Sequence, residues 1–286
     1  MDQIVSETEF KRACVIGSPI AHSRSPLIHN YWLKQHGIAG SYDKIEVKPG
    51  ELSAFFASMA TLGFAGCNVT VPHKEEALRL AKHRTARADE FGAANTIWFE
   101  DGELCADNTD SHGYEMSLDQ DAPGWDSAER ALVLGAGGAS RAIIAALLRR
   151  GVERIDLVNR SVERAEELAR LFGKSVRAFG FERAPALMKD ADLLVNTTAL
   201  GMLGKEPLDL SLDTLKEGAL VSDIVYVPLE TGLLKQAKAR SHRVAGGLGM
   251  LLHQAVPGFV YWFGAAPEVT PALRAILEDD VRKAGG

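Results

Sequence analysis

The sequence predicts an α/β protein of two domains, from three observations. Short apolar runs typical of buried strands alternate with helical stretches along most of the chain. A glycine-rich turn over residues 135–138 joins one such strand to a helix. The length of 286 residues is typical of about two domains. The alternation stops and resumes near residues 112–128, and we predict that the chain divides there.

Bulk composition restricts the function classes. Hydrophobic residues make up 46% of the chain, enough for sizeable cores, and the net charge of −6 argues against nucleic acid or an anionic membrane as a partner. No run approaches the roughly 20 apolar residues that span a bilayer. The acidic stretch Met1–Glu9 lacks a signal-peptide core. We therefore expect a cytoplasmic protein.

Cysteine and histidine usage gives no metal signature. Cys14, Cys67 and Cys105 are far apart, and no pair has metal-ligand or redox spacing. The eight histidines are scattered as well. We expect reduced, buried thiols and no metal site.

The first strand and helix enclose a serine-rich loop. Residues 12–17 read as a strand, and residues 26–36 as a helix with proline first and Gly37 at its end. We predict Ser25 as the N-cap. Ser23 and Ser25 would then present two hydroxyls beside a positive helix end, which suits a carboxylate. Alternatively, Ser25 only caps the helix and Ser23 is loop.

A strand over 41–47, a helix over 51–61 and a strand over 66–71 follow. Asn68 and Thr70 lie near the end of the last strand, and being two residues apart they share one face. Polar residues at the carboxyl end of a strand in an α/β sheet face the ligand crevice.

Lys74 begins the next predicted helix. A positive charge at a helix N-terminus opposes the helix dipole and gains nothing structurally. A bound anion or carboxylate would explain it, whereas the alternative is an ordinary solvated lysine.

Residues 94–99 and 103–107 read as a hairpin around an Asp-Gly turn. Asp110 follows, and a helix from about Ser111 leads towards the glycine turn. Asp110 could merely cap that helix.

The second domain opens with strand 131–134, a glycine turn, and a helix over 139–150. Gly135 permits the tight turn, and Gly137 lets a pyrophosphate approach bare backbone N–H groups at a helix N-terminus. This is the first unit of a Rossmann fold, although Ser140 stands where a third Gly or Ala would pack. An ordinary tight turn is the alternative.

The next strand, over residues 154–158, ends in Asn159, Arg160 and Ser161, with Arg164 one helical turn later. A cofactor with a free ribose 2′-hydroxyl usually meets Asp or Glu about 20 residues after the glycines. Two guanidiniums suit a dianionic 2′-phosphate instead. We therefore predict NADP(H) rather than NAD(H), with a solvated helix start as the alternative for Arg160 and Arg164.

Further strands are predicted near 176–178, 191–195 and 219–223. Residues 245–254 open a long apolar helix to about Phe263, and a last helix covers 270–283. These last helices follow the glycines at positions 246, 247 and 249. We expect the helices to return to the first domain.

Together these motifs resemble the shikimate dehydrogenase family over about residues 15–263, in the family's order. No single motif is decisive, but their joint occurrence is highly specific. The motifs are Ser23-Arg-Ser25-Pro26, Asn68-Val-Thr70-Val-Pro-His-Lys74, Ala94-Asn95-Thr96, Asn108-Thr109-Asp110, the glycine turn, Asn159-Arg160-Ser161 and the stretch Gly247 to Gln254.

The resemblance implies a fold with two α/β domains and a crevice between them. Residues 1–112 with 246–286 would form the substrate-binding domain, and residues 113–245 the Rossmann NADP-binding domain. Ser23, Ser25 and Tyr226 would bind the substrate carboxylate. The ring hydroxyls would be held by Asn68, Thr70, Asn95, Asp110 and Gln254. The NADP site would be lined by Gly135, Ala136, Gly137, Gly138, Ala139, Asn159, Arg160, Ser161, Arg164, Ile224 and Gly247.

The implied reaction is the reversible NADPH-dependent reduction of 3-dehydroshikimate to shikimate, a step of aromatic amino acid biosynthesis. Lys74 and Asp110 would be the catalytic pair. Lys74 beside a carboxylate stays charged, so it can polarise the carbonyl and donate a proton. Asp110 would bond both Lys74 and a substrate hydroxyl, while the cofactor supplies the hydride. A monomer and a homodimer are equally compatible with the sequence.

The sequence departs from the family pattern at two places. Many relatives have Gly directly after the aspartate of the Asn-Thr-Asp motif, where this chain has Ser111-His112. Many also have Asn-Ala-Thr where this chain has Asn196-Thr197-Thr198. Both departures leave the catalytic pair intact.

Three rival functions stay open. One is a quinate/shikimate dehydrogenase of relaxed specificity, or a relative that acts on an amino analogue. Another is a non-catalytic NADP-binding regulator, against which Lys74 and Asp110 argue. The third is a methyltransferase, in which Arg160 and Arg164 would have no role.

Overall fold

A computed structural model describes residues 10–285 and resolves two compact units. Unit 1 contains the residues up to Thr109 together with Ala255–Leu273, and unit 2 contains Asp110–Gln254 together with the residues from Arg274 onwards. The predicted fold class, two α/β units, is confirmed. The acidic stretch Met1–Glu9 lies outside the described residues.

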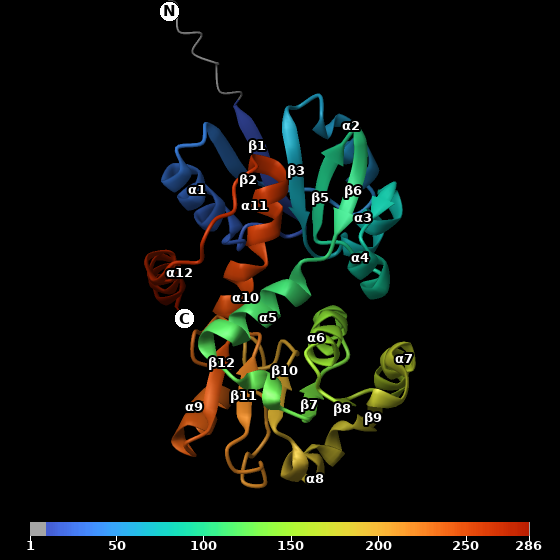
Figure 1. The fold of residues 1–286 in the computed structure, drawn as a ribbon, viewed down its shortest axis with the longest axis vertical. Coiled ribbons are helices and arrows are strands. Elements are labelled where there is room, and N and C mark those ends of the chain that lie inside the picture. Colours follow the sequence, from blue (N-terminus) through green and yellow to red (C-terminus); the bar gives the residue numbers. More distant parts are fainter. Residues whose placement is uncertain (1–9, 286) are drawn as a thin grey trace, which may run out of the picture. The chain divides into compact units, whose positions relative to one another are not determined.

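The sheet of unit 1 has the strand order β2-β1-β3-β5-β6-β4 (Figure 1). Its strands are β1 (Lys11–Gly17), β2 (Gly40–Glu46), β3 (Phe64–Val69), β4 (His83–Arg84), β5 (Thr96–Glu100) and β6 (Glu103–Asp107). β1 pairs in parallel with β2 and β3, whereas β5 is antiparallel to β3 and β6. The β5–β6 hairpin turns at Asp101 and Gly102, with φ of 50° and 78°, as the Asp-Gly signal predicts.

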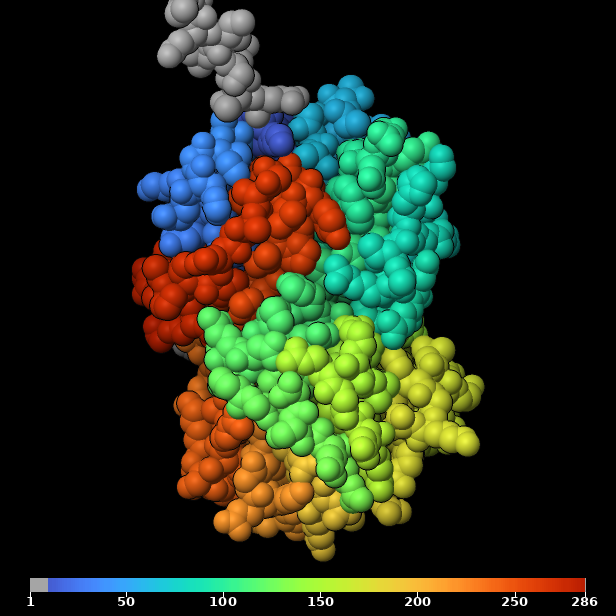
Figure 2. All heavy atoms as spheres, viewed as in Figure 1, coloured from blue at the N-terminus to red at the C-terminus, as the bar shows by residue number. Residues whose placement is uncertain are grey.

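The helices of unit 1 are α1 (Ser25–His36), α2 (Leu52–Met59), α3 (Lys74–Leu80), α4 (Ala86–Phe91) and α11 (Ala255–Phe263). Helix α11 returns from far along the chain and packs on β1 and β3 (Figure 1). Its Trp262 Nε1 donates a hydrogen bond to Ile97 O at 2.8 Å. A Cβ on Gly66 would meet that indole at 2.1 Å, so only glycine fits there. Figure 2 shows this red-orange segment at the surface, between blue and green segments of the same unit.

The sheet of unit 2 is fully parallel, with the order β12-β11-β10-β7-β8-β9. Its strands are β7 (Arg130–Leu134), β8 (Arg154–Asn159), β9 (Val176–Gly180), β10 (Leu193–Asn196), β11 (Leu220–Asp223) and β12 (Arg243–Gly246). Read from β9 to β12, with β7 counted as the first strand, this is the 3-2-1-4-5-6 order of the Rossmann fold. The predicted Rossmann arrangement is therefore confirmed.

The helices of unit 2 are α5 (Asp110–Asp121), α6 (Gly138–Arg149), α7 (Val162–Phe172), α8 (Ala184–Leu187), α9 (Gly232–Ala239) and α10 (Leu248–His253). Short 3₁₀ turns cover Trp125–Ser127, Gly173–Ser175, Phe181–Arg183 and Met188–Asp190. Helix α12 (Pro271–Lys283) begins in unit 1 and continues in unit 2.

Strand β7 is buried on both faces, as expected for a parallel sheet. Ala131 and Val133 join the core beneath α6, whereas Leu132 and Leu134 join a second core on the opposite face. The connection over residues 197–219 forms no regular helix, but four of its leucines cover that second face: Leu208, Leu210, Leu212 and Leu215.

The structure corrects two details of the predicted elements. Ser25 is the first residue of α1 rather than its N-cap, which is Arg24. The Oγ of Ser23 accepts the Ser25 N–H at 3.3 Å, so the serine before the helix partly satisfies its end. The predicted single helix from residue 245 to 263 is strand β12 followed by two helices that break at Gln254.

The remaining predictions from composition concern the cysteines, membrane-spanning helices and metal sites. All three cysteines are free and buried, as predicted. Within residues 10–285 no helix combines the length and apolar character needed to cross a membrane. No group of three or more His, Cys, Asp or Glu in that range could hold a metal ion.

Candidate functional site

The predicted substrate residues of unit 1 form a buried hydrogen-bonded cluster. Asn68, at 5% exposure, is the penultimate residue of β3. Its Oδ1 accepts the Tyr42 hydroxyl at 2.6 Å, and its Nδ2 donates to Asn95 O at 3.1 Å. Because these bonds use both ends of the amide, they define which end faces which neighbour.

Asn95 links this cluster to the segment that carries Asp110. Its side-chain Oδ1 accepts the Thr109 N–H at 2.9 Å, and its own N–H donates to Asp107 O at 3.0 Å. Asp110 follows Thr109 directly as the first residue of α5. The residue before the predicted catalytic carboxylate is therefore held by a predicted substrate ligand.

Lys74 is the first residue of α3, after the N-cap His73. Its carbonyl accepts the Ala94 N–H at 2.9 Å, which brings its backbone beside that of Asn95. Glu75 and Glu76 occupy the same helical turn and suit the helix dipole, whereas Lys74 does not. The electrostatic reason for expecting a partner or ligand at Lys74 therefore holds in the structure.

The serines of the α1 loop lie together. Ser23 Oγ and Ser25 Oγ are 3.3 Å apart, and Ser25 is 6% exposed. Burial raises the pKa of Tyr42 well above its ordinary value, although hydrogen bonding to Ser25 and Asn68 opposes this. A neutral Tyr42 phenol therefore connects the predicted carboxylate-binding serine with the predicted hydroxyl-binding amide.

Thr70 lies just beyond β3 and is held by the first strand. Its N–H donates to Ile16 O at 2.9 Å. A Cβ on Gly17 would come within 2.5 Å of the Thr70 methyl group, so the close approach requires glycine.

The glycine turn of unit 2 joins β7 to α6, as predicted. Gly135 has φ 99°, which L side chains rarely adopt, and a Cβ there would meet Thr198 Cγ2 at 2.7 Å. Gly137 and Gly138 are exposed, and a Cβ on either would meet no heavy atom within 4 Å. The backbone is thus open to a ligand at the start of α6.

The Gly137 N–H itself is bonded within the turn. It donates to Ser140 Oγ at 3.0 Å, and the Ala136 N–H donates to Asn159 Oδ1 at 3.2 Å. The N–H groups available to an anion are those of the first turn of α6, from Gly138 onwards, because a helix gives these no internal acceptor.

Ser140, which replaces the third Gly or Ala of the glycine motif, lies against Thr197, one of the departures from the family pattern. Their hydroxyl oxygens are 2.8 Å apart, and Ser140 Oγ donates to Gly135 O at 2.7 Å. Thr197 Oγ1 also donates to Leu134 O at 2.7 Å. The two hydroxyls therefore hold the glycine turn against the end of β10 through hydrogen bonds.

The predicted 2′-phosphate residues lie at the end of β8 and the start of α7. Arg160 and Arg164 are exposed, and Ser161 is the N-cap of α7. Sequence reasoning missed Glu163, whose Oε2 accepts the Ser161 hydroxyl at 2.7 Å. That hydrogen bond lowers the pKa of Glu163, so a carboxylate accepts from the serine at the start of α7.

Ile224 and Gly247 are also brought together. A Cβ on Gly247 would meet Ile224 O at 2.0 Å, although φ of −74° at this N-cap suits any residue. The glycine is needed for close approach and not for its backbone angle. Tyr226 lies in the loop after β11, and Gln254 caps the C-terminus of α10.

Three family descriptions match the chain. "Shikimate dehydrogenase substrate binding domain" covers residues 15–97, "Shikimate / quinate 5-dehydrogenase" residues 120–225, and "Shikimate 5'-dehydrogenase C-terminal domain" residues 247–277. A curated relative from Brucella melitensis, "Shikimate dehydrogenase (NADP(+))", is 54% identical over 278 residues, which is 96% of either chain. The chain belongs to the shikimate dehydrogenase family.

Solved structures of this family share the fold. Shikimate dehydrogenase of Thermus thermophilus, in complex with NADP(H) and shikimate, is 35% identical over 96% of this chain and 99% of its own, with a TM-score of 0.83. Quinate dehydrogenase of Corynebacterium glutamicum, in complex with NAD, is 27% identical over 95% of this chain and 100% of its own, with a TM-score of 0.88. The fold therefore does not by itself separate shikimate from quinate, or NADP from NAD.

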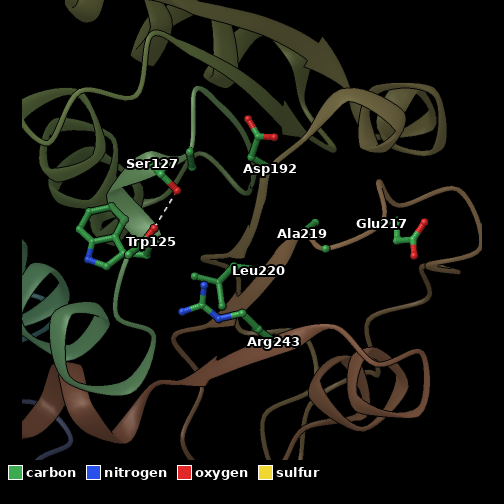
Figure 3. Close-up of a pocket in the computed structure, with 10 residues that line it drawn as sticks. Trp125, Ser127, Asp192, Glu217, Ala219, Leu220 and Arg243 are labelled. Carbon is green, nitrogen blue, oxygen red and sulfur yellow. Dashed lines mark hydrogen bonds between the residues drawn. The ribbon is translucent and has the colours of Figure 1, made fainter.

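A pocket of about 160 Å³ lies elsewhere in unit 2 (Figure 3). Asp192, Leu220 and Arg243 line it at the amino ends of β10, β11 and β12. Ligands of α/β sheets bind outside the carboxyl ends of the strands, and no residue predicted from the shikimate dehydrogenase motifs lines this pocket.

Sequence reasoning also missed Tyr42 and the Arg87–Asp107 ion pair. Each is hydrogen-bonded to a residue that the shikimate dehydrogenase motifs identify. The Tyr42 hydroxyl donates to Asn68, and the Asp107 carbonyl accepts from the Asn95 N–H. Tyr42 stands in a strand, and Arg87 is 20 positions from Asp107, so no local spacing links them to the site.

Proposed function

We propose that this protein catalyses the reversible NADPH-dependent reduction of 3-dehydroshikimate to shikimate. Identity of 54% to a curated NADP-dependent relative along almost the whole chain supports the reaction. The structural observation that carries the proposal is the cluster that joins Asn68 and Asn95 to the segment before Asp110.

In this proposal the serines and amides of unit 1 supply most of the contacts to the substrate. The hydroxyls of Ser23 and Ser25 bind its carboxylate with help from Tyr226, beside the N-terminus of α1. The ring hydroxyls are bound by Asn68, Thr70, Asn95, Asp110 and Gln254. The existing hydrogen bonds of Asn68 and Asn95 keep these amides oriented before substrate arrives, which reduces the entropy lost on binding.

Lys74 and Asp110 carry the proton chemistry in this proposal. The ammonium of Lys74 polarises the C=O that is reduced and donates a proton to the oxygen as it becomes an alkoxide. In the oxidative direction the neutral amine accepts that proton. Asp110 pairs with the ammonium and binds a substrate hydroxyl, which orients the proton donor towards the carbonyl.

NADP(H) fits the residues of unit 2. The open backbone at Gly137 and Gly138 and the N-terminus of α6 suit the pyrophosphate. Asn159, Arg160, Ser161 and Arg164 suit the 2′-phosphate, provided that Ser161 exchanges its bond to Glu163 for one to phosphate. Ile224 and Gly247 also line the NADP site, and the bound cofactor supplies the hydride.

Quinate is a second candidate substrate, because the fold matches a quinate dehydrogenase with a TM-score of 0.88. The two reactions share the same carboxylate and ring-hydroxyl contacts. Arg160 and Arg164 favour NADP over NAD in either case.

Steady-state assays at about 340 nm test the proposal, with shikimate and quinate each combined with NADP+ and NAD+. Shikimate with NADP+ should give the highest kcat/KM. A higher kcat/KM for quinate would replace the substrate assignment, and a higher value with NAD+ would remove the cofactor assignment. Light scattering would distinguish a monomer from a homodimer. We also propose that the enzyme works in the cytoplasm.

A further inference from the structure

The ion pair of Arg87 and Asp107 lies directly behind the segment that carries Asp110. Asp107 is the last residue of β6 and its side chain is fully buried, whereas that of Arg87 on α4 is 32% exposed. Arg87 Nε donates to Asp107 Oδ1 at 2.6 Å, and Arg87 Nη2 donates to Oδ2. This is the two-point geometry of a guanidinium on a carboxylate.

Three further donors converge on the same carboxylate. Thr85 Oγ1 and the Asn108 N–H each donate to Oδ1 at 2.7 Å, and the Tyr261 hydroxyl donates to Oδ2 at 3.1 Å. Burial raises the pKa of Asp107, but the hydrogen bonds from Arg87 and Thr85 outweigh it and the pKa is lowered. Burial raises the pKa of Tyr261 to about 12, so its hydroxyl stays a donor.

These bonds restrain every residue between β6 and Asp110. The Asn108 N–H is held by Asp107, and Asn108 Nδ2 donates to Ala93 O at 2.9 Å. The Thr109 N–H is held by Asn95, whose own N–H is held by the Asp107 carbonyl. Asp107 therefore restrains the chain towards Asp110 through its side chain and Asn95 through its backbone.

Stability alone does not explain a buried ion pair, because well-packed apolar residues are often as stable in its place. In some proteins such a pair instead specifies one conformation among several. Here the conformation specified is that of the chain immediately before the predicted catalytic carboxylate. A misplacement of about 1 Å at a catalytic group can cost on the order of a hundredfold in rate.

We infer that Arg87 and Asp107 are positioning residues, which hold residues 107–109 so that Asp110 and Asn95 are correctly placed for the reaction. The inference rests on the proposed function for its kinetic consequences. Its structural consequence, a rigid segment before α5, does not.

Asp107→Asn is the direct test, because the amide keeps the shape but presents N–H donors to the donors that now converge on the carboxylate. The kcat for shikimate oxidation should fall about tenfold to a hundredfold, with the KM for NADP+ unchanged. The double variant Asp107→Asn/Asp110→Asn should lose less kcat than the product of the two single losses, because Asp107 acts in part through Asp110. Multiplying losses would overturn the inference.

Asp156→Asn is the matched control. Asp156 is 7% exposed and binds both Arg154 and Arg177, at 3.1 Å and 2.9 Å, within the sheet of unit 2. It should lower stability without a specific loss of kcat. If both variants lose kcat alike, the role of Asp107 is structural only.

Amide hydrogen exchange separates this inference from the proposed function. Exchange at Asn108 and Thr109 should accelerate in Asp107→Asn and stay unchanged in Asp156→Asn, whatever the substrate. Should Asp107→Asn fail to fold, Arg87→Lys keeps the charge, loses the fork and should show the same pattern more weakly. Unchanged exchange overturns the inference, whereas a wild-type protein inactive on shikimate overturns the proposed function alone.

Discussion

The predicted substrate residues of unit 1 and the predicted cofactor residues of unit 2 differ in how the fold holds them. Asn68 and Asn95 are buried and bonded to each other and to the backbone around them. Arg160 and Arg164 are exposed at the start of α7. Substitutions in the first set should therefore change stability and activity together, whereas changes to the arginines should affect cofactor binding alone.

The largest effect is expected at Lys74, which is only partly buried and so can be removed at little structural cost. Lys74→Ala should lower kcat by about 10²–10⁴-fold, the usual contribution of a general acid–base group, and leave the melting temperature near wild type. Lys82→Ala, at an exposed ion pair with Glu103 just beyond α3, is the control and should be near neutral. Retention of more than about a tenth of kcat in Lys74→Ala would exclude the acid–base role.

Arg160→Ala should weaken NADP+ binding by about 1.5–3 kcal/mol, the scale of a hydrogen bond to a charged group, and leave NAD+ binding nearly unchanged. Calorimetric titration with both cofactors measures this. Arg170→Ala, at an exposed position in the last turn of α7, should alter neither affinity. Equal losses for NADP+ and NAD+ in Arg160→Ala would mean that Arg160 does not contact the 2′-phosphate.

Unit 1 should carry a pH dependence through His29, which is fully buried and stacks on Tyr42 with ring centroids 4.0 Å apart. Burial lowers the pKa of His29 from 6.5 to about 3. The unfolded chain therefore binds a proton that the folded chain excludes, and stability present above pH 6.5 is lost as the pH falls. Between pH 7 and pH 5 His29 alone should contribute about 2 kcal/mol to the loss.

Denaturant unfolding at the two pH values measures that loss, and His29→Gln should reduce it by about 2 kcal/mol. His253→Gln provides a comparison in unit 2, because burial also lowers the pKa of His253, to about 4. The same pH dependence in wild type and His29→Gln would contradict the account of His29.

The smallest effect is expected at the glycine turn. Ser140→Ala and Thr197→Ala should each destabilise by about 1 kcal/mol, the usual contribution of a hydrogen bond. Because their hydroxyls are 2.8 Å apart, the double variant should cost less than the sum of the two. Additive losses in denaturant unfolding would show that the two hydroxyls act independently.

The comparison also separates what the sequence predicts from what it does not. The glycine turn, the NADP arginines and the Asp-Gly hairpin are local patterns with a local physical cause, and the structure has the turn and the hairpin at the predicted positions. Strand β12 was missed because four residues, beginning with an arginine, are too short to show a period. The break at Gln254 was missed because apolar residues continue on both sides of it.

The framework behind the predicted site was missed for a different reason. Tyr42 contacts Asn68 across 26 positions, and Arg87 contacts Asp107 across 20 positions, through contacts that form only when the chain folds. The sequence pattern places Ser25 at the N-cap, whereas in the structure Ser25 is the first residue of α1. The reason is that the turn before α1 places Arg24 at the N-cap.

A crossed binding experiment tests the central claim, that substrate recognition and cofactor recognition belong to separate sets of residues. Calorimetry would measure shikimate and NADP+ separately on wild type, Ser25→Ala and Arg160→Ala. The account predicts that Ser25→Ala weakens shikimate binding alone and that Arg160→Ala weakens NADP+ binding alone. Weaker binding of both ligands in either variant, with the fold intact by circular dichroism, would contradict it.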